Sequence, residues 1–120
     1  MLATWLIQKD PDVQRYWSRL TDRDTAWLEA FEQAELSLSE KPYPFHNDPG
    51  VIKHLKGGFN CNHEYRTLPN AQRIFYKIWP RKDIEEGLRR SQPGVPVVLK
   101  WESEEQLGVV VFFYAGPHPR

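Results

Sequence analysis

The residues best suited to chemistry lie in a basic segment between positions 51 and 82. Seven Lys and Arg side chains stand there beside a single acid, Glu64, which gives a net charge of +6. Cations contact phosphates and exposed rings stack on bases, so this composition is typical of a surface that binds nucleic acid. The alternative is that alternation only places the charges on the solvated face of a sheet. The basic residues are Lys53, Lys56, Arg66, Arg73, Lys77, Arg81 and Lys82, and the interleaved rings are Phe59, Tyr65, Phe75, Tyr76 and Trp79.

The rest of the chain carries the opposite charge. Lys plus Arg and Asp plus Glu each number 16, so the net charge of the chain is zero. Residues 1–50 contribute −4 and residues 83–120 contribute −2. The net charge of zero is therefore the sum of a basic segment and two acidic ones, and it does not exclude a polyanionic partner. We expect any affinity for RNA to come from one local face and to weaken at high salt.

Two helices are predicted in front of the basic segment, after a short β-prone stretch at 4–8. Asp10-Pro11-Asp12 supplies an N-cap and a proline at the first helical position. Thr21 and Asp24 give a weaker capping signal for a second helix, which ends near Ser39. The apolar residues at helical spacing are Val13, Trp17 and Leu20 in the first helix, and Trp27, Leu28, Phe31, Ala34 and Leu38 in the second.

Strands are predicted over 51–58, 62–68, 73–79, 95–101 and 109–114. The unbroken apolar run at 109–114 is typical of a central strand that is covered on both faces. Residues 81–92 are highly charged and fit either a short helix or a loop. The predicted fold class is α+β, with an N-terminal strand and a helical hairpin packed on an antiparallel β-sheet.

Length and composition point to a single domain over residues 1–120. Apolar residues make up 40% of the chain and include five tryptophans, enough to form one core. Cys61 is the only cysteine, so an internal disulfide is excluded and a reducing compartment, the cytoplasm, is expected. No apolar run is long enough for a signal peptide or a spanning helix, so we expect no membrane partner.

A metal site is the weaker interpretation of a small cluster of ligand-type side chains. His54, Cys61 and His63 lie close together in the sequence, and all three can bind zinc. Their spacing matches no recognised zinc pattern, and a fourth ligand would have to be His46 or Glu64. We therefore expect neither a metal nor another cofactor.

The order of elements and several short motifs resemble the RelE/ParE toxin superfamily. Leu55-Lys56-Gly57-Gly58 follows the predicted helices, Arg73-Ile74-Phe75-Tyr76 stands in a predicted strand, and the last apolar strand ends in a basic tip. The resemblance is strongest over 51–78 and 109–118. The connection at 80–108 is longer than in the family, so a RelE-like fold would carry an insertion between its third and last strands.

The resemblance implies a toxin of a type II toxin–antitoxin system, with a cognate antitoxin protein as its partner. RelE-like members are ribosome-dependent endoribonucleases that cut mRNA, whereas ParE-like members act on DNA gyrase and lack the nuclease side chains. Residues 63–66 stand where RelE has lysines, so the histidine-based YoeB-like and HigB-like branches are the closer analogy. We expect a metal-independent mRNA endoribonuclease that acts on the ribosome. The alternatives are a ParE-like inhibitor of an enzyme such as gyrase, and an orphan interaction module without toxicity.

The same resemblance assigns roles to individual residues. Arg73 matches the arginine that contacts the scissile phosphate, and His118 stands where family nucleases place a catalytic histidine or arginine. Attack by the 2′-OH needs a base, an acid and positive charge on the transition state; histidine can act as either acid or base near neutral pH, and the arginine fork holds phosphate oxygens. Glu64 is an alternative to His63 as the counterpart of His118. The predicted catalytic residues are Arg73, His118, Arg66, His63 and Tyr114, and the predicted RNA contacts are Lys53, Lys56 and Lys77.

Each main assignment also has a purely structural alternative. Tyr114 fits packing at the end of an apolar strand as well as it fits a role on substrate. His118 fits a tail residue without catalytic function. Arg73 fits an ion pair with an acid of the second helix, Glu32 or Glu35.

Overall fold

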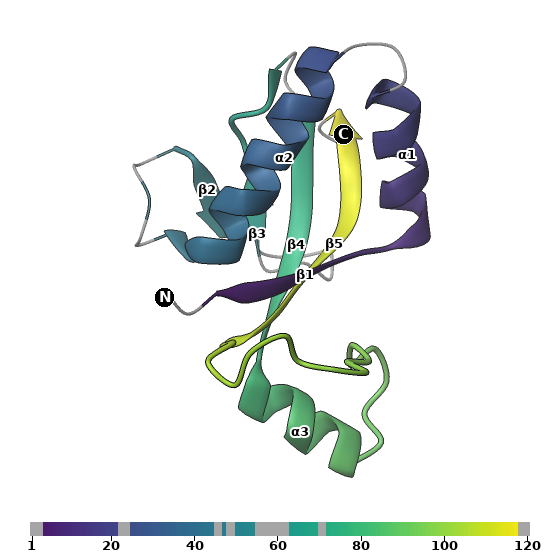
Figure 1. Cartoon of the computed structure of the whole chain (residues 1–120), viewed down its shortest axis with the longest axis vertical. Helices are drawn as coiled ribbons and strands as arrows, with labels where there is room; N and C mark the ends of the chain where they lie inside the picture. The colour runs from purple at the N-terminus through teal and green to yellow at the C-terminus, as the bar shows by residue number, and fades with distance from the viewer. Residues whose placement is uncertain are drawn as a thin grey trace.

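Two helices lie across one face of a five-stranded sheet, and a third lies at the far end of the sheet (Figure 1). This computed structural model describes residues 4–21, 25–44, 47, 50–54, 63–69 and 72–117. None of the helices in these ranges has the length and apolar character needed to cross a bilayer. The predicted α+β class is confirmed. The elements are β1 (Trp5–Lys9), α1 (Pro11–Thr21), α2 (Thr25–Glu40), β2 (Ile52–His54), β3 (His63–Tyr65), β4 (Gln72–Pro80), α3 (Arg81–Arg89) and β5 (Gly108–Pro117).

The sheet has the strand order β1-β5-β4-β3-β2. Strands β2 to β5 form antiparallel pairs, whereas β1 runs parallel to β5 with Trp5 opposite Gly108. The sheet is therefore mixed, and the prediction of an antiparallel sheet is wrong for this one pair. Residue alternation predicts which side chains share a face but carries no information on strand direction. β1 and β2 lie at the two edges of the sheet, and α1 and α2 lie between them in the chain.

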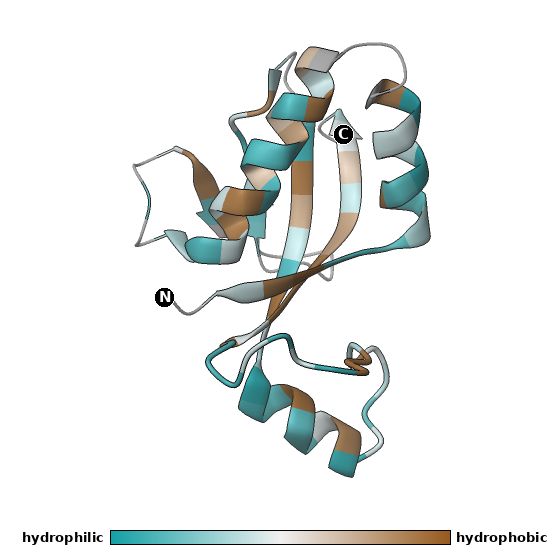
Figure 2. Ribbon diagram, viewed as in Figure 1, coloured by the Kyte–Doolittle hydropathy of each residue, from teal (hydrophilic) through white to brown (hydrophobic). Residues whose placement is uncertain are grey.

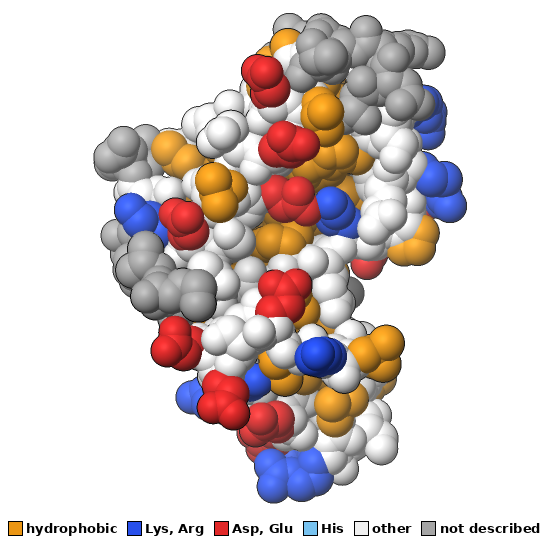
Figure 3. All heavy atoms as spheres, viewed as in Figure 1, with side chains coloured by type: hydrophobic (Ala, Val, Ile, Leu, Met, Phe, Trp, Pro, Cys, Tyr) orange, Lys and Arg blue, Asp and Glu red, His pale blue; other side chains and the backbone are white. Residues whose placement is uncertain are grey.

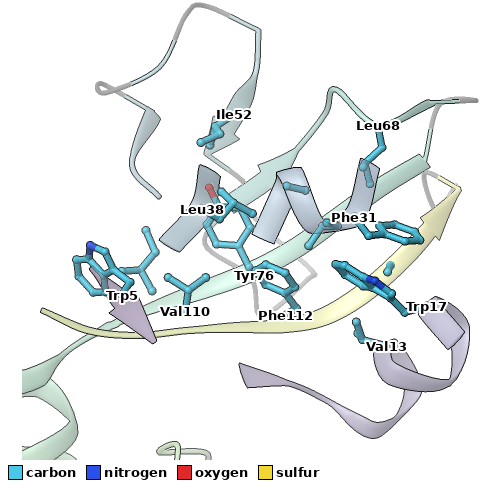
Figure 4. Packing of buried hydrophobic residues seen from close by; sticks show 14 residues of the cluster. Trp5, Val13, Trp17, Phe31, Leu38, Ile52, Leu68, Tyr76, Val110 and Phe112 are labelled. Atoms are coloured by element: carbon cyan, nitrogen blue, oxygen red, sulfur yellow. The ribbon is translucent and has the colours of Figure 1, made fainter. Parts of the chain in front are cut away.

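The main core lies between α1, α2 and the sheet face that they cover, which we call the inner face (Figure 4). The ring of Trp17 lies with its centroid 4.0 Å from that of Phe31 and 6.1 Å from that of Phe112. Leu28, predicted to belong to the apolar stripe of α2, is instead 39% exposed, because it lies one position off that stripe. The predicted helical positions that are buried are Val13, Trp17, Phe31, Ala34 and Leu38.

The central position of β5 is confirmed. It lies between β1 and β4, and both Val109 and Val110 are fully buried although they point to opposite faces. Hydrophobic residues concentrate along the first half of β5 in Figure 2 and give way to paler ones toward its end. From Val111 onward the side chains opposite the inner face are half-buried. The prediction that β5 is covered on both faces is therefore correct only for the first half of the strand.

The opposite side of the sheet, which we call the outer face, is covered at one end by α3 and residues 90–107. Trp79, Ile84 and Val109 form a second buried cluster there. Residues 81–92 thus contain a helix, one of the two alternatives left open by the sequence. The predicted strand at 95–101 is wrong: the segment makes no strand pairing, and Leu99 is 97% exposed. Pro96 lacks an N–H to donate, and β5 already has a strand on each side.

Tyr76 lies at the centre of the main core. Its side chain is fully buried, and its hydroxyl donates a hydrogen bond of 2.7 Å to the Pro42 carbonyl. Burial is the main cause that raises the pKa of Tyr76 well above its usual value, and Tyr65 contributes to the same shift. The folded chain therefore disfavours the tyrosinate.

The raised pKa of Tyr76 predicts loss of stability in alkali. Below pH 10 the tyrosine is protonated in both states and its full contribution is present; above pH 10 only the unfolded state loses the proton, so stability falls. In the Tyr76→Phe variant we expect the free energy of unfolding to fall less steeply above pH 10, by about 1.4 kcal/mol per pH unit, than in the wild type. Urea unfolding at pH 8, 10 and 11 measures this. An identical pH slope in both proteins would contradict it.

Candidate functional site

Four side chains of β4 alternate onto the outer face of the sheet. Ile74, Tyr76 and Ile78 join the main core, so Arg73, Phe75, Lys77 and Trp79 must point the other way. The end of this face that carries Arg73 lies away from α3, which packs where β4 ends. The candidate site is this Arg73 end of the outer face.

Arg73 is held by three interactions. Its Nε lies 2.9 Å from Oε1 of Glu64, a residue of the neighbouring strand β3. Its Nη1 donates to the carbonyl oxygens of Arg66 at 3.0 Å and Gln72 at 3.2 Å. The side chain of Glu64 is only 2% exposed and that of Arg73 18% exposed. The guanidinium is therefore fixed in orientation while part of it still reaches the surface.

Tyr114 reaches the same end of the outer face from β5. It is the register partner of Phe75, and the two ring centroids lie 5.1 Å apart. Its hydroxyl donates to the Pro117 carbonyl and lies over Gly116, where an added Cβ would come within 3.0 Å of it. Gly116 is in turn the register partner of Arg73. The tyrosine hydroxyl and the Arg73 strand position are thus neighbours across one strand pair.

A second tyrosine joins this edge from α1. The hydroxyl of Tyr16 donates to Oε1 of Gln72, whose register partner Pro117 immediately precedes His118. Burial raises the pKa of Tyr16, with a further contribution from Tyr114, and burial alone raises that of Tyr114. Both hydroxyls therefore stay protonated at neutral pH and donate their protons within the protein, to Gln72 and to Pro117.

The other predicted basic contacts lie around this site. Arg66 is exposed. Lys53 is exposed on β2 and is the register partner of Glu64. Lys77 lies four residues beyond Arg73 on β4, with its Nζ 4.5 Å from the centroid of the Trp79 ring. Arg73, Tyr114 and Lys53 thus share one part of the outer face, the Arg66 backbone adjoins Arg73, and Lys77 extends this part toward α3.

His63 is separated from these residues by the sheet. It is 6% exposed, and its ring stacks on that of Tyr76 with centroids 5.4 Å apart and meets Tyr43 edge-on at 6.3 Å. Of the two predicted counterparts for His118, Glu64 therefore lies beside Arg73, whereas His63 belongs to the inner core. His118 and Lys56 lie outside the described residues, as do Cys61 and His46. Within the described residues no three His, Cys, Asp or Glu side chains gather in a way that could hold a metal.

The charge separation inferred from the sequence has a spatial counterpart. α2 carries four glutamates and no Lys or Arg. Acidic side chains gather over α2 on the helical side of the molecule (Figure 3). The Arg66, Arg73 and Lys53 positions belong to the opposite side of the sheet. An anionic ligand would therefore be favoured at the outer face and disfavoured over α2.

The Glu64–Arg73 contact was missed in the sequence, which suggested an acid of the second helix. Glu35 pairs instead with Lys9, at 2.5 Å, and Arg73 pairs across the sheet. A signal was present, because Glu64 is the only acid among seven basic residues in the segment 51–82. Comparison of the chain with family models, with curated proteins and with solved structures gives no match. The site is therefore interpreted from its own geometry.

Proposed function

We propose that this chain is a RelE-like toxin that cuts mRNA on the ribosome without a metal, and that a cognate antitoxin covers its outer face. The observation that carries the proposal is that Arg73, whose guanidinium donates to the Arg66 carbonyl, and Tyr114 lie together at the end of β5 that precedes His118. The element order β-α-α-β-β-β-α-β, which is the order β-α-α-β-β-β followed by α3 and one further strand, also supports it.

In this proposal Arg73 binds the scissile phosphate. The Glu64 carboxylate, 2.9 Å from Nε, restricts the guanidinium to one orientation, which lowers the entropy lost when a phosphate binds. Arg66 adds a second, exposed positive charge that offsets the charge developing on the phosphate. Tyr114, whose proton goes to the Pro117 carbonyl, offers its hydroxyl oxygen as an acceptor to a substrate hydroxyl, and His118 supplies the titrating group that moves the proton.

One observation favours a second candidate, a non-nucleolytic protein that binds and inhibits a target enzyme, as ParE-like members inhibit gyrase. The charge of Arg73 is opposed by a buried carboxylate, and only 18% of its side chain is exposed. An arginine engaged in this way can serve to hold β3 against β4. The two candidates differ in whether Arg73 contacts substrate.

Induced expression in a bacterial host separates these functions. We expect the wild type to arrest growth and to fragment translated mRNA. Arg66→Ala removes an exposed charge, and Arg73→Lys keeps the charge opposite Glu64 but loses the planar fork; each should lower mRNA cleavage about 100-fold. Arg89→Ala is the matched control, because it removes an exposed arginine from α3, away from the site. Cleavage is read by primer extension on a reporter message.

The three outcomes assign the function. Cleavage that is lost in Arg66→Ala and kept in Arg89→Ala supports the nuclease. Growth arrest with intact mRNA refutes the nuclease and favours the enzyme inhibitor. Normal growth at equal protein levels refutes both toxins and leaves an interaction module.

A further inference from the structure

A hollow opens on the outer face between β4 and α3, next to the candidate site. Its volume is about 310 Å³. That is at the lower end of the range for small-molecule sites, roughly 300–1,000 Å³. The side chains that matter for its chemistry are Lys77, Trp79, Asp83, Glu86, Arg90 and Gln92.

The walls of the hollow combine hydrogen-bond donors and acceptors. Asp83 and Glu86 supply carboxylate oxygens, and Gln92 supplies an amide that can both donate and accept. Glu86 also lies 2.7 Å from Nη2 of Arg90, in an ion pair that is exposed to solvent and therefore weak. Two acids face two bases, so selection in this hollow depends on hydrogen-bond geometry more than on net charge.

The hollow is built on packed elements. Ile84 fixes α3 to the outer face at 2% exposure. At Gly87 a Cβ would lie 2.6 Å from Cγ2 of Val95, so a larger residue there would displace the Val95 side chain that packs on α3. The turn after α3 is closed by a 2.8 Å hydrogen bond from the Gln92 N–H to the Gly87 carbonyl. A site that exists before its ligand arrives loses less entropy on binding.

Lys77 connects the hollow to the candidate site. It lines the hollow and lies on the same face of β4 as Arg73, four residues away. At the strand rise this is about 13 Å. A short single strand whose phosphate sits at Arg73 can therefore pass Lys77 and bring a neighbouring base to the hollow.

We propose that this hollow binds one base of the RNA strand held at Arg73, and that it selects a base with an exocyclic amino group. Carboxylates accept hydrogen bonds from such amino groups, and unpaired bases present their edges to single-strand-binding proteins. Uracil has no amino group to donate to Asp83 or Glu86 and should be disfavoured. The inference rests on the proposed RNA-cleaving function and adds a base preference to it.

Titration of the ¹⁵N-labelled protein with CMP and with UMP tests the hollow without any cleavage. We expect CMP to shift the amide signals of Gly87 and Gln92 and to bind about tenfold more tightly than UMP. Glu86→Ala should abolish this preference. Glu85→Ala is the matched control on the same helix, since Glu85 is exposed and does not line the hollow. Equal affinities for CMP and UMP, or a preference that survives Glu86→Ala, would overturn the proposal.

A second titration tests the link to the RNA strand. The probes are a 2′-O-methyl hexauridylate, which cannot be cut, and the same strand with one cytidine. We expect the cytidine strand to bind more tightly than CMP, and Arg66→Ala to weaken the strand several-fold while leaving CMP affinity unchanged. A strand that binds no better than CMP would overturn the RNA-strand proposal in favour of a free-nucleotide site. If the protein prefers CMP but cuts no mRNA in the expression assay, only the proposed nuclease function is refuted. If it cuts mRNA but does not prefer CMP, only the proposed base-binding role of the hollow is refuted.

Discussion

Arg73→Ala is expected to lower the free energy of unfolding by about 3–5 kcal/mol, because it removes the guanidinium that pairs with a buried carboxylate. Glu64 is 2% exposed and lies 2.9 Å from Nε of Arg73. Glu64→Ala should cost less, since the arginine is 18% exposed and its long stem can carry the charge into solvent. Urea unfolding of both variants measures the difference.

A double-mutant cycle shows whether the two residues are coupled. The double variant Glu64→Leu/Arg73→Met removes both charges and keeps side-chain volume. Its loss in the free energy of unfolding should be smaller, by about 1–3 kcal/mol, than the sum of the losses in the single variants Glu64→Leu and Arg73→Met. Arg66→Ala is the control: it removes an exposed arginine beside the pair and should change stability by no more than about 0.5 kcal/mol. If Arg73→Ala and Arg66→Ala have equal effects, the pair contributes nothing to the fold.

The parts of the fold that could be predicted are those in which a local pattern coincides with burial. The helical spacing of Val13 and Trp17 identifies α1, that of Phe31 and Leu38 identifies α2, and the apolar run at 109–114 identifies β5. Each pattern reflects the surface that the element buries. The segment at 95–101 has the same β-prone composition, yet it forms no strand. Val95, Val98 and Trp101 pack against the cluster of Trp79 and Val109, whereas Leu99 is exposed. Pairing with a neighbouring strand is a non-local event that composition does not report.

The positive charge of the candidate site could be predicted from the sequence, but the arrangement of its side chains could not. The basic character of the segment follows from residue type, whereas the role expected for Arg73 came from the resemblance to a toxin family. Which of His63 and Glu64 meets Arg73 depends on strand register, since adjacent residues point to opposite faces. The register places His63 against Tyr76 in the core. The hollow at α3 could not be inferred at all, because it exists only where α3 meets the sheet.

Among alanine substitutions of glycines in the described part of the chain, Gly108→Ala is expected to destabilise the protein most. It should lower the free energy of unfolding by about 3 kcal/mol or more. Gly108 lies at the point where three strands meet, paired with Trp5 of β1 and Pro80 of β4. A Cβ there would lie 2.1 Å from the Trp79 carbonyl oxygen and 2.8 Å from Cζ3 of Trp5. The first of these atoms is backbone, so relief requires the β4–β5 pair to separate.

Gly94→Ala is the informative comparison. Gly94 has a φ of +81° and nothing within 4 Å of an added Cβ, so alanine there costs only the strain of the left-handed backbone, about 1–2 kcal/mol. Thermal unfolding of the two variants separates a packing clash from backbone strain. The clash at Gly108 should also disturb Trp5 and Trp79, so its near-UV circular dichroism should change, whereas that of Gly94→Ala should match the wild type. Equal losses at both positions would mean that β1, β4 and β5 do not meet as closely as 2.1 Å implies.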